Sequence, residues 1–395
     1  MILSSLRSIN LSLDYGFFWP LIAFSLSILV SYICYPAIIR VSKIKRLMPM
    51  PNHRSVHKVR TPNLGGIGVF IAINLIITFL GNYFEDDNLL SLLGAITILF
   101  FTGLIDDLID MKAKHKLLSQ VLTTLAIVLL TNLRIHNFHG ILGIYELPYF
   151  MSVILTVLGY VLIINAYNLI DGVDGLAGTY AIAITSFFGI FYFFNGNDSM
   201  FFLSICIVGS LISFLFFNFS KKEKIFMGDT GSMVVGFLLA YQAFGFLSVE
   251  FNPAFLIQSS KAPVFVLALF TFPFVDTIRV FVIRILNGKN PLTADRNHIH
   301  HVFLENGIKH WKISLIVSVI SMFTVLGMFI FNELNINKQL IFLVCLWGTF
   351  IVFVRNMKLL NTIKEGVQAT QITKDTAVAD EKQHKGKRIV MRDMA

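Results

Sequence analysis

Carboxylate side chains stand in three short segments that border long apolar runs. Asp106 and Asp107 lie in GLIDDLID, Asp171 and Asp174 in NAYNLIDGVDGLAG, and Asp229 in FMGDTGS. Adjacent ionised carboxylates repel each other unless a cation or a basic group compensates their charge. Oxygen ligands from several loops are what Mg²⁺ or Mn²⁺ needs to hold a phosphate. Together the segments indicate a divalent-metal phosphate site, although one pair alone could be a solvated helix end or a helix cap.

Glycine accompanies each of these carboxylate segments. It directly follows Asp171 and Asp174, where it lets the backbone approach a bulky ligand and can adopt a positive φ if a turn requires it. The plainer alternative is a polar loop built on Asp-Gly turns. After Asp229, we expect Thr230 or Ser232 to cap the helix that follows, whose free N–H groups could also face an anion.

Basic side chains follow the first carboxylate pair. Lys114 and Lys116 could hold a phosphate as point charges. Their place in a short loop between apolar runs has a second explanation, because cytoplasmic loops of membrane proteins carry an excess of Lys and Arg. For each lysine taken alone, this second explanation is the favoured one.

Three histidines stand close together in the segment RNHIHH. His298 and His300, with Arg296 and His301 nearby, could contact a diphosphate or a sugar. Three histidines within four residues could instead bind zinc. Since no cysteine is close and several aspartates offer hard oxygen ligands, we favour the phosphate or sugar contact.

The segment GGIGVF, which begins at Gly65, resembles a phosphate-binding loop only superficially. No Gly-Lys-Ser or Gly-Lys-Thr follows Gly66, and the segment opens an apolar run. Close helix packing or close approach to a ligand is therefore the expected role of the two glycines.

The composition places these polar segments in a membrane protein. Hydrophobic residues make up 55% of the 395 residues and charged residues only 14%, against roughly 25% in soluble domains. The net charge of +9 does not indicate nucleic-acid binding, because the basic residues lie in short loops between apolar runs. The three cysteines, inside apolar runs and without paired spacing, indicate neither disulfides nor zinc.

Apolar runs long enough to cross the membrane predict an all-α polytopic fold of about eleven transmembrane helices. The runs lie at about 17–39, 65–81, 88–105, 117–132, 148–166, 177–194, 200–218, 232–248, 262–286, 312–330 and 339–355. Several are short, so broken or tilted helices are expected. We assign 1–355 to a single transmembrane catalytic domain and 356–395 to a polar tail whose role the sequence leaves open.

Charge in the loops predicts the orientation of the spans. The loop after the first span is rich in Lys and Arg, whereas the loop 82–88 carries Glu85, Asp86 and Asp87 and no basic residue. Cytoplasmic loops are the basic ones, which places the N-terminus outside and the C-terminus in the cytoplasm. The carboxylate, lysine and histidine segments then all lie on the cytoplasmic side of the membrane.

At these motifs the chain resembles the polyprenyl-phosphate N-acetylhexosamine-1-phosphate transferases of the MraY and WecA type, in glycosyltransferase family 4. The resemblance runs in order through RSVHK with PNLGG, GLIDDLID with HKLL, NAYNLIDGVDGLAG, MGDTGS and DRNHIHH. It implies ten or eleven helices, Mg²⁺ dependence, a UDP-N-acetylhexosamine donor, an undecaprenyl phosphate acceptor and UMP as leaving group. The single HIHH segment is closer to the WecA branch, which implies UDP-GlcNAc more than UDP-MurNAc-pentapeptide.

The resemblance also implies residue roles. Asp229 and Asp174 match metal-ligand positions, Asp106 and Asp107 match the catalytic pair, and Asn168 with Asp171 falls where the family contacts the nucleotide. For catalysis we expect Asp106, Asp107, Asp171, Lys116 and His300. For substrate binding we expect Asn168, Lys114, Arg296, His298, His301, Gly65 and Gly66.

In the expected reaction, the acceptor phosphate attacks the β-phosphorus of the donor. Asp106 is a candidate base or orienting group for this attack, and we do not assume a covalent intermediate on it. The predicted location is the cell inner membrane, and a homodimer is left open. One alternative is a transporter or flippase for an anionic solute, which would place its polar residues near mid-span. A CDP-alcohol phosphotransferase is a poorer match, because LAGTYAIAI lacks the Arg and the later aspartates that such a site requires.

Overall fold

The computed structural model describes residues 18–48, 60–84, 86–252, 257–289 and 297–359. Within them the chain is a bundle of helices with one short β-hairpin. The first half contains α2 (Phe18–Ile44), α3 (Gly66–Leu80), η1 (Gly81–Phe84), α4 (Asn88–Ile109), α5 (Ala113–Thr131), α6 (Tyr149–Ile170) and α7 (Leu176–Phe194). The second half contains α8 (Asp198–Asn218), α9 (Gly228–Ser248), η2 (Ser259–Lys261), α10 (Ala262–Leu269), α11 (Thr271–Leu286), α12 (Ile299–Glu305), α13 (His310–Ile330) and the C-terminal helix Ile336–Leu359.

Ten helices in the described part of the chain are long and apolar enough to cross a membrane. A bent pair, Ser259–Leu269 with Thr271–Leu286, brings the number to eleven if it counts as one span. The expected all-α multi-pass membrane architecture is therefore confirmed. The C-terminal helix runs to Leu359, four residues past the expected domain boundary at 355, and the tail beyond it lies outside the described residues.

The bent pair corresponds to the run at 262–286 that the sequence suggested as one span. Its two helices meet at an angle of 61°. Pro273 has no N–H, so the carbonyl of Leu269 loses the helical donor four residues ahead of it. The hydroxyl of Tyr180 donates to this carbonyl instead, at 2.6 Å. A side chain from α7 thus satisfies the backbone group that the break leaves open.

Helix α9 forms the centre of the bundle. Within its most apolar stretch 94% of the residues are buried, against 11% for the C-terminal helix. It packs against α4, α6 and α3. A helix that is apolar on all sides is expected to be surrounded by other helices, and small residues let their backbones approach closely.

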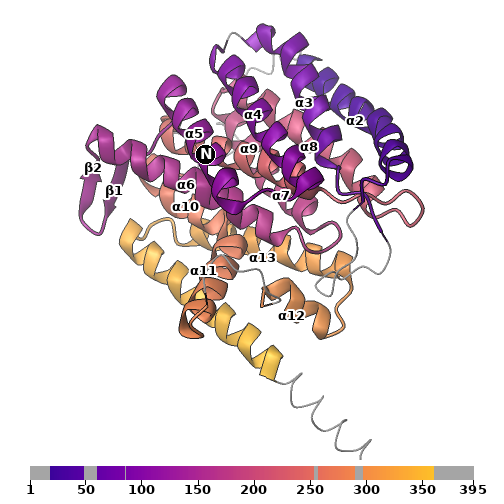
Figure 1. Cartoon of the computed structure of the whole chain (residues 1–395). Coiled ribbons are helices and arrows are strands. Elements are labelled where there is room, and N and C mark those ends of the chain that lie inside the picture. The colour runs from indigo at the N-terminus through magenta and orange to yellow at the C-terminus, as the bar shows by residue number, and fades with distance from the viewer. Residues whose placement is uncertain (1–17, 49–59, 85, 253–256, 290–296, 360–395) are drawn as a thin grey trace, which may run out of the picture.

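The bundle has two chemically different ends. At one end, α4, α6 and α8 finish while α5, α7 and α9 begin, so the carboxylate segments converge there. The other end carries η1 and an antiparallel hairpin of β1 (Asn137–Ile141) and β2 (Ile144–Glu146), which the sequence analysis did not anticipate. Figure 1 shows the hairpin projecting from one side of the bundle, and α11, α12 and the C-terminal helix lying together on another.

Candidate active site

The Asp107 carboxylate holds the N-terminus of α9. Its Oδ1 accepts hydrogen bonds from Asn63 Nδ2 at 2.8 Å and from the Asp229 N–H at 2.9 Å. Its Oδ2 accepts the Thr230 N–H at 2.8 Å and the Thr230 hydroxyl at 2.5 Å. The expectation that Thr230 or Ser232 caps α9 is wrong. The cap comes from another helix, because the free N–H groups of a helix start attract a carboxylate.

Asp171 completes this cap from the loop after α6. It accepts a hydrogen bond from the Gly228 N–H, the first residue of α9. Burial raises the pKa of Asp171 to about 7, and repulsion from the nearby carboxylates of Asp229, Asp107 and Asp174 adds to the rise. The N–H groups that begin α9 are therefore taken by protein carboxylates in this structure.

Glycine is required where these segments meet. Gly228 has φ +72°, and a Cβ there would lie 1.8 Å from the Asn63 carbonyl oxygen. A Cβ on Gly66 would lie 2.1 Å from the Gly231 nitrogen, so α3 and α9 touch backbone to backbone. Gly65 and Gly66 are buried and donate their N–H groups to the carbonyls of Phe226 and Met227, at 2.8 and 2.9 Å. Packing accounts for both glycines, and their contact with substrate stays a prediction.

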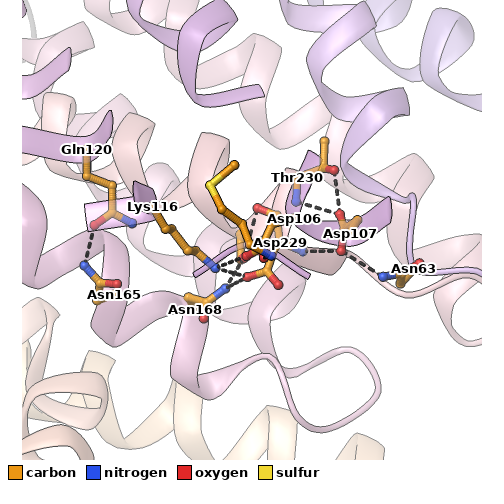
Figure 2. A network of polar contacts seen from close by, with 11 residues as sticks. Asn63, Asp106, Asp107, Lys116, Gln120, Asn165, Asn168, Asp229 and Thr230 are labelled. Carbon is orange, nitrogen blue, oxygen red and sulfur yellow. Dashed lines mark hydrogen bonds and ion pairs between the residues drawn. The ribbon is translucent and has the colours of Figure 1, made fainter. Parts of the chain in front are cut away.

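The Lys116 ammonium joins Asp106 and Asp229. Its Nζ lies 2.9 Å from Asp106 Oδ2 and also donates to Asp229 Oδ1, as Figure 2 shows. The side chain of Asp106 is 8% exposed and that of Asp229 33% exposed. Of these two carboxylates, Asp229 is therefore the one that a ligand can reach more easily.

Amide side chains of α6 extend the network. Asn168 Nδ2 donates to Asp229 Oδ1 at 2.6 Å and to the Ser232 hydroxyl at 2.5 Å. One helical turn earlier, Asn165 Nδ2 donates to Gln120 Oε1 at 2.7 Å. Figure 2 shows that this amide pair lies beside the carboxylate–lysine cluster. Lys114 is exposed on α5 and is not part of the cluster, so its role as a phosphate ligand stays a prediction.

Asp174 has partners of its own. Its Oδ2 lies 2.6 Å from Lys224 Nζ and 3.1 Å from His310 Nδ1. Ser314 donates its hydroxyl to the Asp174 carbonyl at 2.9 Å, which ties the loop to the start of α13. Asp174 therefore does not share the Lys116 ammonium with Asp229, and its assignment as a second metal ligand stays a prediction.

The histidines lie at the start of α12. His298 Nδ1 is 2.8 Å from Asp276 Oδ2, and its ring is parallel to that of His300 within 6° at a centroid distance of 5.5 Å. His300 packs against the Asp-Gly loop, since a Cβ on Gly172 would lie 2.5 Å from His300 Nε2. The ring of His301 is tilted by 51° against that of His300, at a centroid distance of 4.3 Å. Arg296 lies outside the described residues.

The arrangement of the carboxylates bears on how a magnesium ion could be bound. Among the described residues, no group of three or more His, Cys, Asp or Glu side chains could hold a metal ion. Asp106 and Asp229 nevertheless turn one oxygen each towards a single cationic nitrogen. Mg²⁺ is usually bound by one or two carboxylates together with substrate phosphates. The site therefore suits a metal that arrives with a diphosphate more than a metal held by protein alone.

Sequence reasoning missed four contributors to this site. They are Asn63, Lys224 and His310, which contact aspartates in distant segments, and Asp276, which contacts His298. Asn63 sits in the PNLGG segment and Lys224 in a basic loop, so each carried a weak signal. Asp276 carried a stronger one, because an ionisable residue inside an apolar run marks a functional candidate.

The chain is similar in sequence to known glycosyl transferases. The sequence profile of glycosyl transferase family 4 matches residues 89–247. A probable undecaprenyl-phosphate N-acetylglucosaminyl 1-phosphate transferase of Bacillus subtilis is 32% identical over 302 residues, which cover 76% of this chain and 81% of the relative. The undecaprenyl-phosphate alpha-N-acetylglucosaminyl 1-phosphate transferase of Escherichia coli K12 is 26% identical over 274 residues, 68% of this chain and 72% of the relative.

Proposed function

Because the chain belongs to glycosyl transferase family 4, together with these 1-phosphate transferases, we propose that it transfers N-acetylglucosamine 1-phosphate from UDP-N-acetylglucosamine to undecaprenyl phosphate. The observation that carries the proposal is the cluster of Asp106, Lys116 and Asp229 at one end of a membrane-spanning bundle. Phosphoryl-type transfer between two anions needs such a site, in which charge is neutralised at fixed positions. A path for a transported solute would instead place its polar groups near mid-span.

The reaction joins an acceptor phosphate oxygen to the β-phosphorus of the donor. The bond between that phosphorus and the bridging oxygen breaks, and UMP leaves with the electron pair. A phosphate monoester has a second pKa near 6, so the acceptor is largely dianionic at neutral pH and needs little help from a base. When bound, Mg²⁺ would neutralise charge on the diphosphate.

The two adjacent aspartates take different roles. A carboxylate offers about four acceptor positions, and Asp107 already accepts four hydrogen bonds. Asp107 therefore holds the start of α9 in place, which sets the position of Asp229. Asp106 accepts from the Met111 N–H at 2.7 Å and from Lys116, so it keeps capacity for a ligand. This difference supports a direct transfer without a covalent intermediate on Asp107.

Lys116 and Asn168 orient the acidic groups. With a donor bound, the Lys116 ammonium can move from carboxylate to phosphate oxygens, because its three N–H donors rotate freely. Asn168 fixes the Asp229 side chain through Oδ1, which leaves Oδ2 for a ligand. Both residues lie one turn or less from the ends of their helices.

The reacting end of the bundle faces the cytoplasm in this proposal. It carries Lys112, Lys114 and Lys224, whereas the opposite end carries Asp86, Asp87, Asp198 and Glu250 around a shared polar hollow. Excess positive charge on loops marks the cytoplasmic side. UDP-sugars are polar donors that reach the enzyme from water, and the lipid acceptor reaches it from the membrane. The proposed location is the cytoplasmic face of the cell inner membrane.

The test is a transfer assay with the purified full-length protein in detergent, undecaprenyl phosphate, Mg²⁺ and radiolabelled UDP-GlcNAc. We expect a labelled, chloroform-extractable lipid and stoichiometric UMP, both abolished by EDTA. Other UDP-N-acetylhexosamines and UDP-MurNAc-pentapeptide are offered in parallel to identify the donor. A folded sample that transfers from none of these donors would refute the proposal.

A further inference from the structure

The buried carboxylate of Asp276, on α11, hydrogen-bonds to the histidine segment. Asp276 Oδ2 lies 2.8 Å from His298 Nδ1, and Asp276 Oδ1 accepts the Ile299 N–H at 2.8 Å. Asp276 is 1% exposed and His298 5% exposed. One carboxylate thus fixes both the ring of His298 and the first backbone N–H of α12. Both residues lie beyond positions 89–247, the range that the family profile matches.

Helix α11 turns its polar face to this segment. Asp276 and Arg279, one turn apart, are buried, whereas Ile278, Val282 and Ile285 on the other face are about half exposed. Arg279 Nη1 donates to the Asn297 carbonyl. From the C-terminal helix, Lys358 Nζ donates to Asn297 Oδ1 at 3.1 Å. Asn297 is therefore held through its backbone carbonyl by α11 and through its side chain by the C-terminal helix.

A neutral group could have satisfied the backbone of α12 at lower cost. Burying a carboxylate is unfavourable unless hydrogen bonds or an opposite charge compensate it, and an amide oxygen would accept the Ile299 N–H as well. What a carboxylate adds is control of the imidazole. When Nδ1 donates to a carboxylate, the tautomer and ring orientation are fixed, and Nε2 becomes the ring atom that meets a ligand.

We propose that Asp276 is a positioning residue, which acts through His298 by directing His298 Nε2 to the diphosphate of the sugar-nucleotide donor. The inference rests on the proposed function, since it concerns the donor side of that same site. It assigns a role to a residue of the broken span, whereas the carboxylate cluster belongs to α4, α5, α6 and α9. The bend between α10 and α11 brings the polar face of α11 to α12.

The test is a double-mutant cycle with Asp276→Asn and His298→Ala. Transfer rate and KM for UDP-GlcNAc and for undecaprenyl phosphate are measured separately for the two single variants and the double variant. We expect Asp276→Asn to raise the donor KM or lower kcat by about tenfold or more, with the lipid KM unchanged. In the His298→Ala background the same change should alter these constants less than about twofold. Effects that multiply in the double variant would overturn the proposal.

A matched control is Asp86→Asn at the opposite end of the bundle. Asp86 likewise accepts a backbone N–H, that of Asn88 at 3.0 Å, and a side-chain donor, the Ser199 hydroxyl at 2.7 Å. We expect its kinetic constants to match those of the wild type. If Asp86→Asn and Asp276→Asn lose equal transfer activity, the loss is general destabilisation, and the positioning role of Asp276 is overturned.

A second variant covers the case in which Asp276→Asn does not fold. In His298→Asn, the amide nitrogen can replace Nδ1 as the donor to Asp276, but nothing replaces Nε2. We expect this variant to keep the wild-type melting temperature and to show the same reduced transfer as His298→Ala. Wild-type activity in His298→Asn would show that Nε2 has no part. If the wild type is active but the effects of Asp276→Asn and His298→Ala multiply in the double variant, this inference alone is refuted. If the folded wild type is inactive, the proposed function is refuted.

Discussion

Thr230 donates both its backbone N–H and its hydroxyl to one carboxylate oxygen of Asp107, a residue 123 positions earlier in the chain. The contact joins the end of α4 to the start of α9. It separates the roles of two aspartates that are neighbours in sequence, because Asp106 points instead to Lys116. Successive residues on a helix are about 100° apart around its axis, so neighbouring side chains face different partners.

Replacing Asp107 by Ala should destabilise the protein. The change leaves the Asp229 and Thr230 N–H groups without their acceptor, at a cost of about 1–3 kcal/mol per buried group. We expect a lower melting temperature in detergent together with lost transfer. Asp106→Ala, as the comparison, should lose transfer with a smaller change in melting temperature. The reverse order of melting temperatures would contradict the assigned roles.

Replacing Lys116 by Met should separate metal binding from transfer. Without the ammonium, Asp106 and Asp229 repel each other, and a divalent cation relieves that repulsion. We expect tighter Mn²⁺ binding in the absence of donor, measured by electron paramagnetic resonance, but slower transfer. Lys112→Met, on an exposed residue of the same segment, should leave both quantities unchanged. Weaker Mn²⁺ binding in Lys116→Met would show that the two carboxylates do not form the cation site.

Asp229 and Asp174 should respond differently to neutralisation. Asp229→Asn removes charge beside Asp106 and should shift the Mg²⁺ activation curve to higher concentration, by about tenfold or more. Asp174→Asn removes the partner of Lys224 and His310, so we expect slower transfer with little change in half-saturating Mg²⁺. The measurement is transfer rate against Mg²⁺ concentration. Equal shifts in the two variants would place Asp174 in the metal site, as its sequence motif suggested.

Two glycines of α4 offer a controlled test of helix packing. A Cβ on Gly103 would lie 2.6 Å from the Thr230 Cα, whereas a Cβ on Gly94 would meet nothing within 4 Å. Gly103→Ala should therefore push α4 away from the start of α9 and lower both melting temperature and transfer. Gly94→Ala should be neutral or stabilising by up to about 1 kcal/mol, because Ala favours helix more than Gly does. A harmless Gly103→Ala would argue against this close contact.

Stability should fall in mildly acidic solution because of His300. Burial lowers the pKa of His300 well below its ordinary value of 6.5, with His301 and His298 lowering it further. The folded chain keeps this imidazole neutral, while the unfolded chain takes up a proton below about pH 6.5. Its contribution is thus complete above pH 6.5 and is lost as the pH falls below that value. The protein should therefore be less stable near pH 5.5 than near pH 7.5.

The check compares melting temperatures near pH 7.5 and 5.5 for the wild type and His300→Gln. The variant lacks the titrating group, so its melting temperature should fall less between the two conditions. An equal fall in both proteins would assign the acid sensitivity to other groups.

The sequence by itself determined the membrane class, the approximate spans and the end of the bundle at which the chemistry lies. These follow from apolar run lengths and from the order of helix ends, both of which are local properties. The motifs around Asp106, Asn168, Asp229 and His298 also determined the family, because their order along the chain is rarely matched by chance.

Only the tertiary structure decided which side chains of these motifs meet. That Asp107 caps α9, that Asp174 pairs with Lys224 and His310, and that α11 bends to bring Asp276 to His298 all depend on contacts between distant segments. Such contacts are set by helix rotation and by close approach at glycines, and hydrophobic periodicity gives the rotation of a helix poorly when every face is apolar. The sequence therefore named most residues of the site, and packing assigned their partners and added Asn63, Asp276, Lys224 and His310.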